Sequence, residues 1–111
     1  MNRPCKLCDA ETFRVLHKLC ARLTRKMPYA LYLAALTAPD MAEAEEQCLR
    51  RLHGGEVLCN MYENYLYILL FAHTDEEAEN TLYPVISRVH GSSVRISRIT
   101  QRLEQDPTYN D

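Results

Sequence analysis

The sequence predicts a single α+β domain, and three observations support this prediction. The chain has 111 residues, the length of one ordinary domain. Two short apolar runs, residues 29–36 and 65–72, are long enough for buried strands and less than half the length of a membrane span. Segments with helical periodicity and capping residues alternate with the predicted strands. We therefore expect helices and strands packed around one core.

The composition excludes several classes of protein. Hydrophobic residues make up 47% of the chain and charged residues 25%, as in ordinary globular proteins. The net charge of −2 provides no broad field that would favour nucleic acid or an acidic membrane surface. Four arginines lie close together in sequence near the C-terminus: Arg88, Arg95, Arg98 and Arg102. They are better explained as charges that keep an exposed edge strand from aggregating than as a nucleic-acid site.

The five cysteines predict the cellular compartment. No signal-peptide pattern is present at the N-terminus, where charged residues interrupt any apolar region. Free thiols in a chain without export features are typical of a reducing cytoplasm. We therefore expect a cytoplasmic protein that does not associate directly with a membrane or with nucleic acid.

The first predicted helix follows an N-terminal arm of residues 1–8. Asp9 is its expected N-cap, because its carboxylate can accept the free amide hydrogens of the first turn. The helix should extend over residues 9–26, where basic residues suit its C-terminal dipole and Pro28 prevents continuation. Its inward stripe is predicted to contain four residues, with Leu19 beside them: Phe13, Leu16, Cys20 and Leu23.

The middle of the chain predicts a strand, a helix and a hairpin. Residues 29–37 have no polar face, which indicates a central strand covered on both sides. Asp40 and Glu43 have capping-box spacing at the start of the next helix, and Gly54 with Gly55 ends that helix. Residues 56–61 and 65–72 then form two strands around a short turn.

The last elements are a helix, a strand and a tail. Thr74 and Glu77 repeat the capping signature, and the helix should continue to Val89 with a bend or break at Pro84. Gly91 ends it, residues 93–99 form the last strand, and residues 101–111 form a flexible tail.

The element order is a helix followed by βαββαβ, which predicts a ferredoxin-like antiparallel sheet with an additional N-terminal helix. The expected domain spans residues 9–100. Numbered along the chain, its four strands should lie in the order four-one-three-two, which makes the second and fourth strands the edges. Two helices should cover one face, and the N-terminal helix should cover the other.

The hairpin segment resembles the centre of a GGDEF nucleotide-cyclase domain. In that family, a strand leads into a signature turn, and an apolar strand and a helix with an acidic start follow. The five signature positions correspond here to Tyr62, Glu63, Asn64, Tyr65 and Leu66. The upstream run 29–37 resembles the metal-bearing first strand of the family.

The departures from this pattern imply the loss of cyclase activity. Bulky Tyr62 and Glu63 replace the two glycines that let substrate approach the backbone. Asn64 and Tyr65 replace the acidic pair, and residues 29–38 contain no carboxylate. Because two-metal phosphoryl transfer needs several hard oxygen ligands, the resemblance implies a protein that is not an enzyme.

A closer resemblance is to the C-terminal domain of clostridial transcription regulators that carry a bacterial transcriptional activator (BTAD) domain or a winged helix. That domain looks like a GGDEF-type fold without catalytic residues, and it includes an extra N-terminal helix. The similar stretches are CDAETFRVLHKLCAR (8–22), YLAALT (32–37) and MYENYLYILL (61–70).

Two further patterns permit a functional or a structural interpretation. Cys5, Cys8, His17 and Cys20 have spacings from which a tetrahedral zinc site could be built. Alternatively, Cys20 and Cys48 are small core residues and Cys5 is a loose thiol. Tyr62, Tyr65 and Tyr67 form either an aromatic recognition surface or an ordinary set of half-buried strand tyrosines.

Together, these features predict a non-catalytic regulatory or interaction module of bacterial signalling or transcription regulation. Its expected partner is a second copy of itself or another signalling or regulatory protein. No cofactor is expected in the main hypothesis. Two alternatives remain: a domain that senses a nucleotide without turnover, and an interaction module stapled by zinc.

Overall fold

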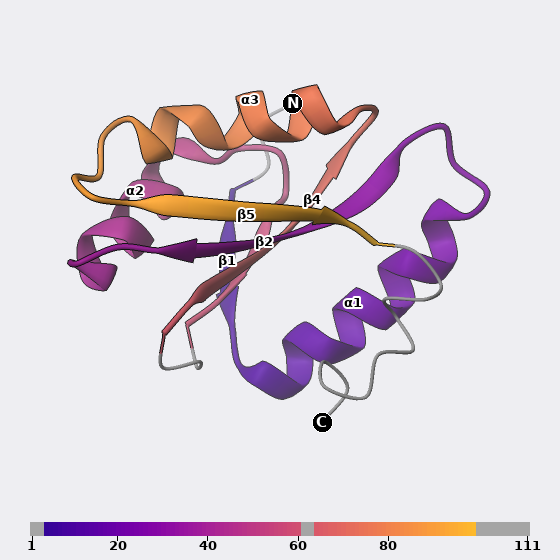
Figure 1. Ribbon diagram of the computed structural model, residues 1–111. Helices are drawn as coiled ribbons and strands as arrows, with labels where there is room; N and C mark the ends of the chain where they lie inside the picture. The colour runs from indigo at the N-terminus through magenta and orange to yellow at the C-terminus, as the bar shows by residue number, and fades with distance from the viewer. Residues whose placement is uncertain (1–3, 61–63, 100–111) are drawn as a thin grey trace.

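The computed structural model describes residues 4–60 and 64–99, which form three helices and a five-stranded mixed sheet (Figure 1). The strands are β1 (Lys6–Cys8), β2 (Ala30–Thr37), β3 (Val57–Cys59), β4 (Leu66–Ala72) and β5 (Ser93–Arg98). The helices are α1 (Ala10–Thr24), α2 (Met41–Arg51) and α3 (Asp75–Ile86). The α+β class predicted from the sequence is confirmed.

The sheet order is β1-β3-β4-β2-β5. The four predicted strands thus have the neighbours expected from the sequence, and they pair antiparallel, for example Leu33 with Leu69 and Ala34 with Ile68. The prediction of a four-stranded, wholly antiparallel sheet is wrong, because β1 adds a fifth strand parallel to β3. The edge strands are consequently β1 and β5.

The additional strand arises where an N-terminal arm was predicted. Its three residues pair with the whole of β3, from Lys6 with Val57 to Cys8 with Cys59. The amide of Lys6 also donates to the carbonyl of Glu56 at 3.0 Å. Three residues carry too little alternation to identify a strand, so this pairing depends on a neighbour that lies about fifty positions away in sequence.

The predicted caps hold all three helices. Oδ1 of Asp9 accepts from the Thr12 amide at 2.8 Å, and Oδ1 of Asp40 accepts from the Glu43 amide at 3.0 Å. Oγ1 of Thr74 accepts from the Glu77 amide at 3.1 Å. These bonds satisfy amide hydrogens that have no carbonyl partner within the first turn.

The end of α3 differs from the prediction. The helix contains Pro84 and is not split there, but it ends at Ile86 and not at Val89. A proline removes one backbone donor, and only two helical residues follow it. Val89 is still buried, and Gly91 then turns the chain with a φ of 71° before β5.

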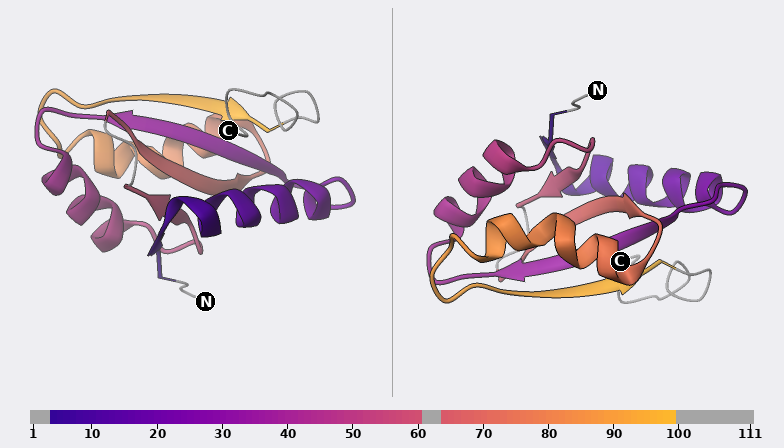
Figure 2. Two further views of the ribbon diagram at one scale, coloured as in Figure 1. Left: turned by 90° about the horizontal axis from the view of Figure 1, so that it is seen from below. Right: turned by 90° about the horizontal axis from the view of Figure 1, so that it is seen from above.

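The helices cover opposite faces of the sheet, as the sequence predicts (Figure 2). α2 and α3 pack over one face with a core that includes Leu36, Leu58 and Ile68. α1 packs over the other, where Phe13 contacts a smaller core that includes Leu33 and Leu69. β2 is buried along nearly its whole length because both layers cover it.

None of the helices within residues 4–60 and 64–99 has the combination of length and apolar character that a membrane span requires.

Candidate functional site

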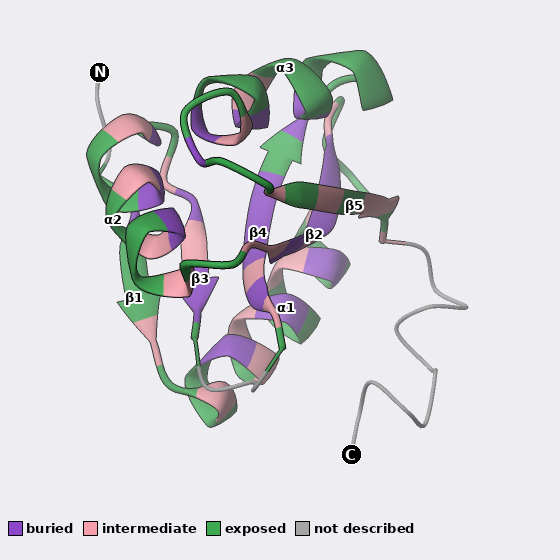
Figure 3. Ribbon diagram, turned by 60° about the vertical axis from the view of Figure 1, so that its left-hand side comes forward, coloured by how far each residue is buried: buried purple, intermediate pink, exposed green. Residues whose placement is uncertain are grey.

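The outer surface of α1 is the most prominent apolar surface of the described chain. Successive residues four positions apart are exposed by 60% at Val15, 50% at Leu19 and 55% at Leu23, and Met27 after the helix is exposed by 47%. Residues at this spacing form one continuous ridge along a helix. We call these four residues the α1 ridge. Figure 3 shows how exposed residues follow the side of α1 that faces away from the sheet.

This ridge corrects the predicted orientation of the helix. Leu23 was expected in the core, whereas the buried residues of α1 are Phe13, His17 and Ala21. Leu16 and Cys20 are only partly buried beside them. Phe13, His17 and Ala21 therefore occupy the sheet side, while three branched apolar side chains face solvent. Burial in the isolated chain does not explain this arrangement.

Charged residues flank the ridge with opposite signs at its two ends. Glu11 is exposed in the first turn, where Asp9 also caps the helix, and Arg22 and Lys26 are exposed at the C-terminal end. This distribution complements the helix dipole within one chain. It also gives the surface an acidic end and a basic end about four turns apart.

The signature positions of the hairpin divide into described and undescribed residues. Tyr62 and Glu63 lie outside the described residues. Asn64 is exposed, Tyr65 is half-buried, and Leu66 begins β4 with a buried side chain. None of these three carries a carboxylate, so they provide no hard oxygen pair for metal-assisted phosphoryl transfer.

The described tyrosines of the hairpin are part of the packing under α1. The rings of Tyr65 and Tyr67 lie with centroids 5.9 Å apart, and the ring of Tyr67 lies 6.4 Å from Phe13 of α1. Tyr67 packs against the smaller core as a partly buried residue. These contacts favour the structural interpretation of the two residues over a free recognition surface.

The structure does not bring the four predicted zinc ligands together. Cys5 belongs to the core under α2 and α3, whereas Cys8 and Cys20 pack against the core under α1. His17 is fully buried within α1. Within the described parts of the chain, no group of three or more histidine, cysteine or acidic residues is placed to hold a metal ion. The arrangement therefore gives no support to a zinc site.

Cys5 instead lies near a buried carboxylate that the sequence did not reveal. Glu56 is buried, and its Oε1 accepts from the Gly54 amide at 2.8 Å. Burial, together with the nearby charges of Glu56 and Cys48, raises the pKa of the Cys5 thiol to about 12. A side chain at Gly54 would meet Glu56 Oε2 at 2.7 Å, so the Glu56 carboxylate would have to shift to make room for it. Cys5 is thus a protonated core residue and not a loose thiol.

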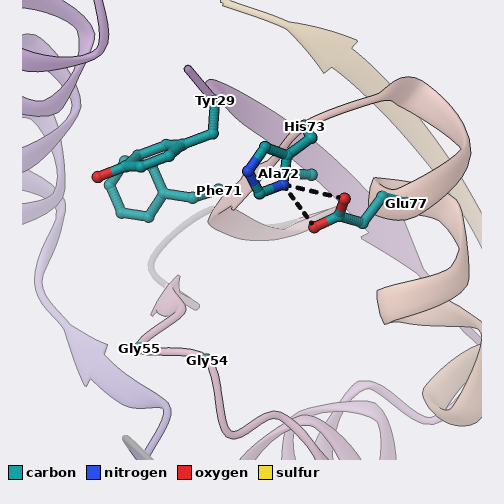
Figure 4. A pocket seen from close by; sticks show the side chains of 7 residues that line it. All are labelled: Tyr29, Gly54, Gly55, Phe71, Ala72, His73 and Glu77. Carbon is teal, nitrogen blue, oxygen red and sulfur yellow. Dashed lines mark hydrogen bonds and ion pairs between the residues drawn. The ribbon is translucent and has the colours of Figure 1, made fainter. Parts of the chain in front are cut away.

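A small pocket lies at the end of the sheet near the start of α3. Its volume is about 210 Å³, and Tyr29, Phe71, His73 and Glu77 form one side of it. Figure 4 shows these four side chains across an open space from the backbone of Gly54 and Gly55. The sequence does not predict this pocket, because its walls come from segments that are far apart along the chain and carry no shared motif.

Comparison of the chain with protein-family models, with curated proteins and with solved structures finds no match in any of the three.

Proposed function

We propose that this chain is a non-catalytic interaction module of bacterial signalling or transcription regulation, and that it associates with a second copy of itself through α1. The α1 ridge is the observation that carries this proposal. It leaves three branched apolar side chains and a methionine half-exposed on one continuous surface. Such surfaces mark interaction sites when they gather in one place on a monomer.

The charges of α1 favour a second copy in antiparallel orientation. In a two-fold pair, a residue that contacts a second residue on the other copy has its contact repeated in reverse, and only residues at the axis meet their own counterparts. If Leu19 of one copy contacts Leu19 of the other at the axis, Val15 of each copy faces Leu23 of the other. Glu11 of each copy then lies near Lys26 of the other. The acidic end of each helix then lies beside the basic end of the other, and the helix dipoles oppose one another. A parallel pair would place like charges together.

The proposed contacts also specify a crossing geometry. A shallow crossing of about 20° keeps two helices side by side over several turns, whereas a crossing of about 50° would separate Glu11 from Lys26 at the helix ends. Buried side chains on one side, Phe13, His17 and Ala21, and the α1 ridge on the other fit a helix that packs on both sides. In the proposed dimer, α1 would contact its own sheet on one side and α1 of the second copy on the other.

We further propose that the sheet is a ferredoxin-like sheet extended at one edge by β1. The order β3-β4-β2-β5 and the two helices over one face support this assignment. The free state of all five cysteines fits a cytoplasmic setting. Asn64 and Tyr65 in place of an acidic pair support the absence of catalysis.

Sedimentation equilibrium of the purified chain tests self-association. We expect a dimer for the unaltered chain and a monomer for Leu19→Glu, because a carboxylate would be buried without a partner at the two-fold axis. Tyr83→Glu is the matched control, since Tyr83 is 68% exposed on α3 and lies outside the proposed interface. A monomeric unaltered chain at high concentration, or equal effects of the two variants, would contradict the proposal.

Charge reversal tests the orientation. Glu11→Lys and Lys26→Glu should each weaken the dimer, because each creates a like-charge contact in an antiparallel pair. The double variant should restore much of the affinity, since the two charges then exchange places across the interface. Additive weakening in the double variant would exclude the antiparallel arrangement.

A further inference from the structure

We propose that the pocket at the start of α3 binds a small organic cation, with a methylated ammonium group held between aromatic rings and the Glu77 carboxylate. The pocket is built from separate places in the fold: the residue before β2, the turn before β3, the end of β4 and the start of α3. Figure 4 shows the rings and the carboxylate gathered on one side of the space.

Three rings form the aromatic part of the pocket. The Tyr29 ring lies 5.5 Å from the Phe71 ring and 6.0 Å from the His73 ring, measured between centroids. The interplanar angle is 77° in both pairs. Rings in nearly perpendicular planes surround a guest from different directions, and the negative faces of tyrosine and phenylalanine attract a cation within about 6 Å.

Phe71 is more exposed than its position in a strand would suggest. It lies in β4 on the same face as Leu69, by the alternation of side chains along a strand. Leu69 is buried, yet 41% of Phe71 is exposed. A ring that remains open to solvent beside a concave space provides a surface that a guest would cover.

Glu77 provides the negative charge. Its carboxylate is half-exposed, and its Oε2 lies 3.2 Å from Nδ1 of His73, so the pair is held one helical turn apart beside the rings. Asp75 and Glu76 add two more acidic residues in the same turn. The described lining of the pocket contains no lysine or arginine. The local field therefore favours cations and opposes phosphate groups.

The size of the pocket limits the guest. Its volume of about 210 Å³ lies below the range of about 300–1,000 Å³ typical of sites for drug-sized ligands. Gly54 and Gly55 face the rings without side chains, and Gly55 has a φ of 78° that suits glycine. The space fits a small head group better than a nucleotide. The small volume of the pocket and its acidic surroundings therefore both favour a small cation as the ligand.

Nuclear magnetic resonance titration of the full chain with choline tests this inference. The neutral control is 3,3-dimethyl-1-butanol, which has the shape of choline with carbon in place of the charged nitrogen. We expect choline to shift the signals of Tyr29, Phe71 and His73, and the neutral analogue to bind about tenfold more weakly. Equal binding of the two compounds, or shifts spread over other parts of the chain, would overturn the proposal.

Variants separate the aromatic and the electrostatic contributions. Phe71→Leu and Glu77→Gln should each reduce the affinity for choline about tenfold, and Tyr83→Leu on the exposed side of α3 should leave it unchanged. A parallel titration with N-acetyl-trimethyllysine amide compares a peptide-borne cation with a free one. The tighter of the two identifies the source of the cation, and binding by neither overturns the proposal. Repeating the titration on Leu19→Glu makes the result independent of self-association.

Discussion

The sheet face under α2 and α3 and the face under α1 are closed to solvent to different degrees. Under the two helices, Ala44, Cys48, Ala78, Leu82 and Val85 have almost no exposed surface. On the other side of the sheet, the core under α1 is smaller, Phe71 remains open near the end of β4, and the α1 ridge is exposed on the outer surface of the helix. One helix is too narrow to cover a sheet face that spans several strands, since its diameter is only about 10 Å.

This difference separates stability from interaction within one small domain. The closed face contains the larger core and should supply most of the stability. The large apolar residues exposed on the closed side stand on three different elements, Leu7 on β1, Leu49 on α2 and Tyr83 on α3, and single exposed apolar residues are ordinary on a protein surface. The open face has a continuous apolar ridge and borders an aromatic pocket. We therefore expect binding to occur on the α1 side of the sheet, where apolar side chains remain exposed.

The largest predicted contrast is between two leucines in helices. Leu82→Ala on the closed face should lower the free energy of unfolding by about 2–5 kcal/mol, because it leaves a cavity in a packed core. Leu19→Ala on the α1 ridge should change it by about 0.5 kcal/mol or less in dilute monomer. Urea denaturation measures both values. Equal losses would show that the two faces are not different in the way described.

The cysteines provide a second contrast between the faces. Cys5 and Cys48 lie in the core under α2 and α3, and burial together with nearby negative charges raises the pKa of each thiol to about 12. Cys8 and Cys20 are only partly buried on the α1 side, although burial raises their pKa values as well. Since the reagent reaches exposed thiols without opening of the core, Cys8 and Cys20 should react faster with iodoacetamide than Cys5 and Cys48.

Mass spectrometry of the alkylated protein checks this order of reaction. A denatured sample is the control, because unfolding should make all five rates similar. Early modification of Cys48 in the folded protein would contradict the closed character of its face.

A hydrogen bond on the closed side offers a smaller test. The hydroxyl of Tyr32, in β2, donates to Oδ1 of Asp75 at 2.7 Å and so connects the sheet to the start of α3. Tyr32→Phe should reduce stability by about 1 kcal/mol, the net contribution of a typical hydrogen bond. Thermal unfolding measures the loss. No loss would indicate that the contact does not hold α3 to the sheet.

The smallest predicted effect is a pH dependence at the cap of α1. Hydrogen bonds from Thr12 lower the pKa of the Asp9 carboxyl below its ordinary value of 3.8. At pH values between the lowered folded-state pKa and the ordinary value of 3.8, the folded state therefore binds fewer protons than the unfolded state. The stabilisation is present above the ordinary pKa and is lost as the pH falls through the lower, folded-state value.

Asp9→Asn isolates this titration. Asparagine caps a helix about as well as aspartate and has no carboxyl to protonate. Thermal melts from about pH 5 to about pH 2 should therefore show a steeper decline for the unaltered chain than for the variant. Parallel curves would exclude a contribution from Asp9.

The sequence predicts the elements of this fold better than its surface. Runs such as residues 29–37 and the capping pairs at Asp40 and Thr74 depend on local chemistry, and these elements formed as expected. β1 was missed because three residues become a strand only when β3 lies beside them. The pocket was missed for the same reason, since Tyr29 and Phe71 meet only after the strands pair.

The orientation of α1 shows a different limit. Periodicity placed Leu23 in the core because an apolar residue normally faces inward. In the structure, His17 and Ala21 of α1 are buried against the sheet instead. Apolar side chains on two sides of a helix leave its orientation ambiguous, and the packing against Leu33 and Leu69 decides it. The residue that misled the prediction is part of the proposed interface.

Chemical cross-linking at the centre of the α1 ridge tests the self-association account most directly. Leu19→Cys would be placed in a chain that also carries Cys8→Ser and Cys20→Ser, and treated with a short bis-maleimide. Two copies of residue 19 meet at the proposed two-fold axis, so we predict efficient formation of a covalent dimer. Tyr83→Cys in the same background should remain a monomer. Equal cross-linking at positions 19 and 83, or none at 19, would contradict pairing through α1.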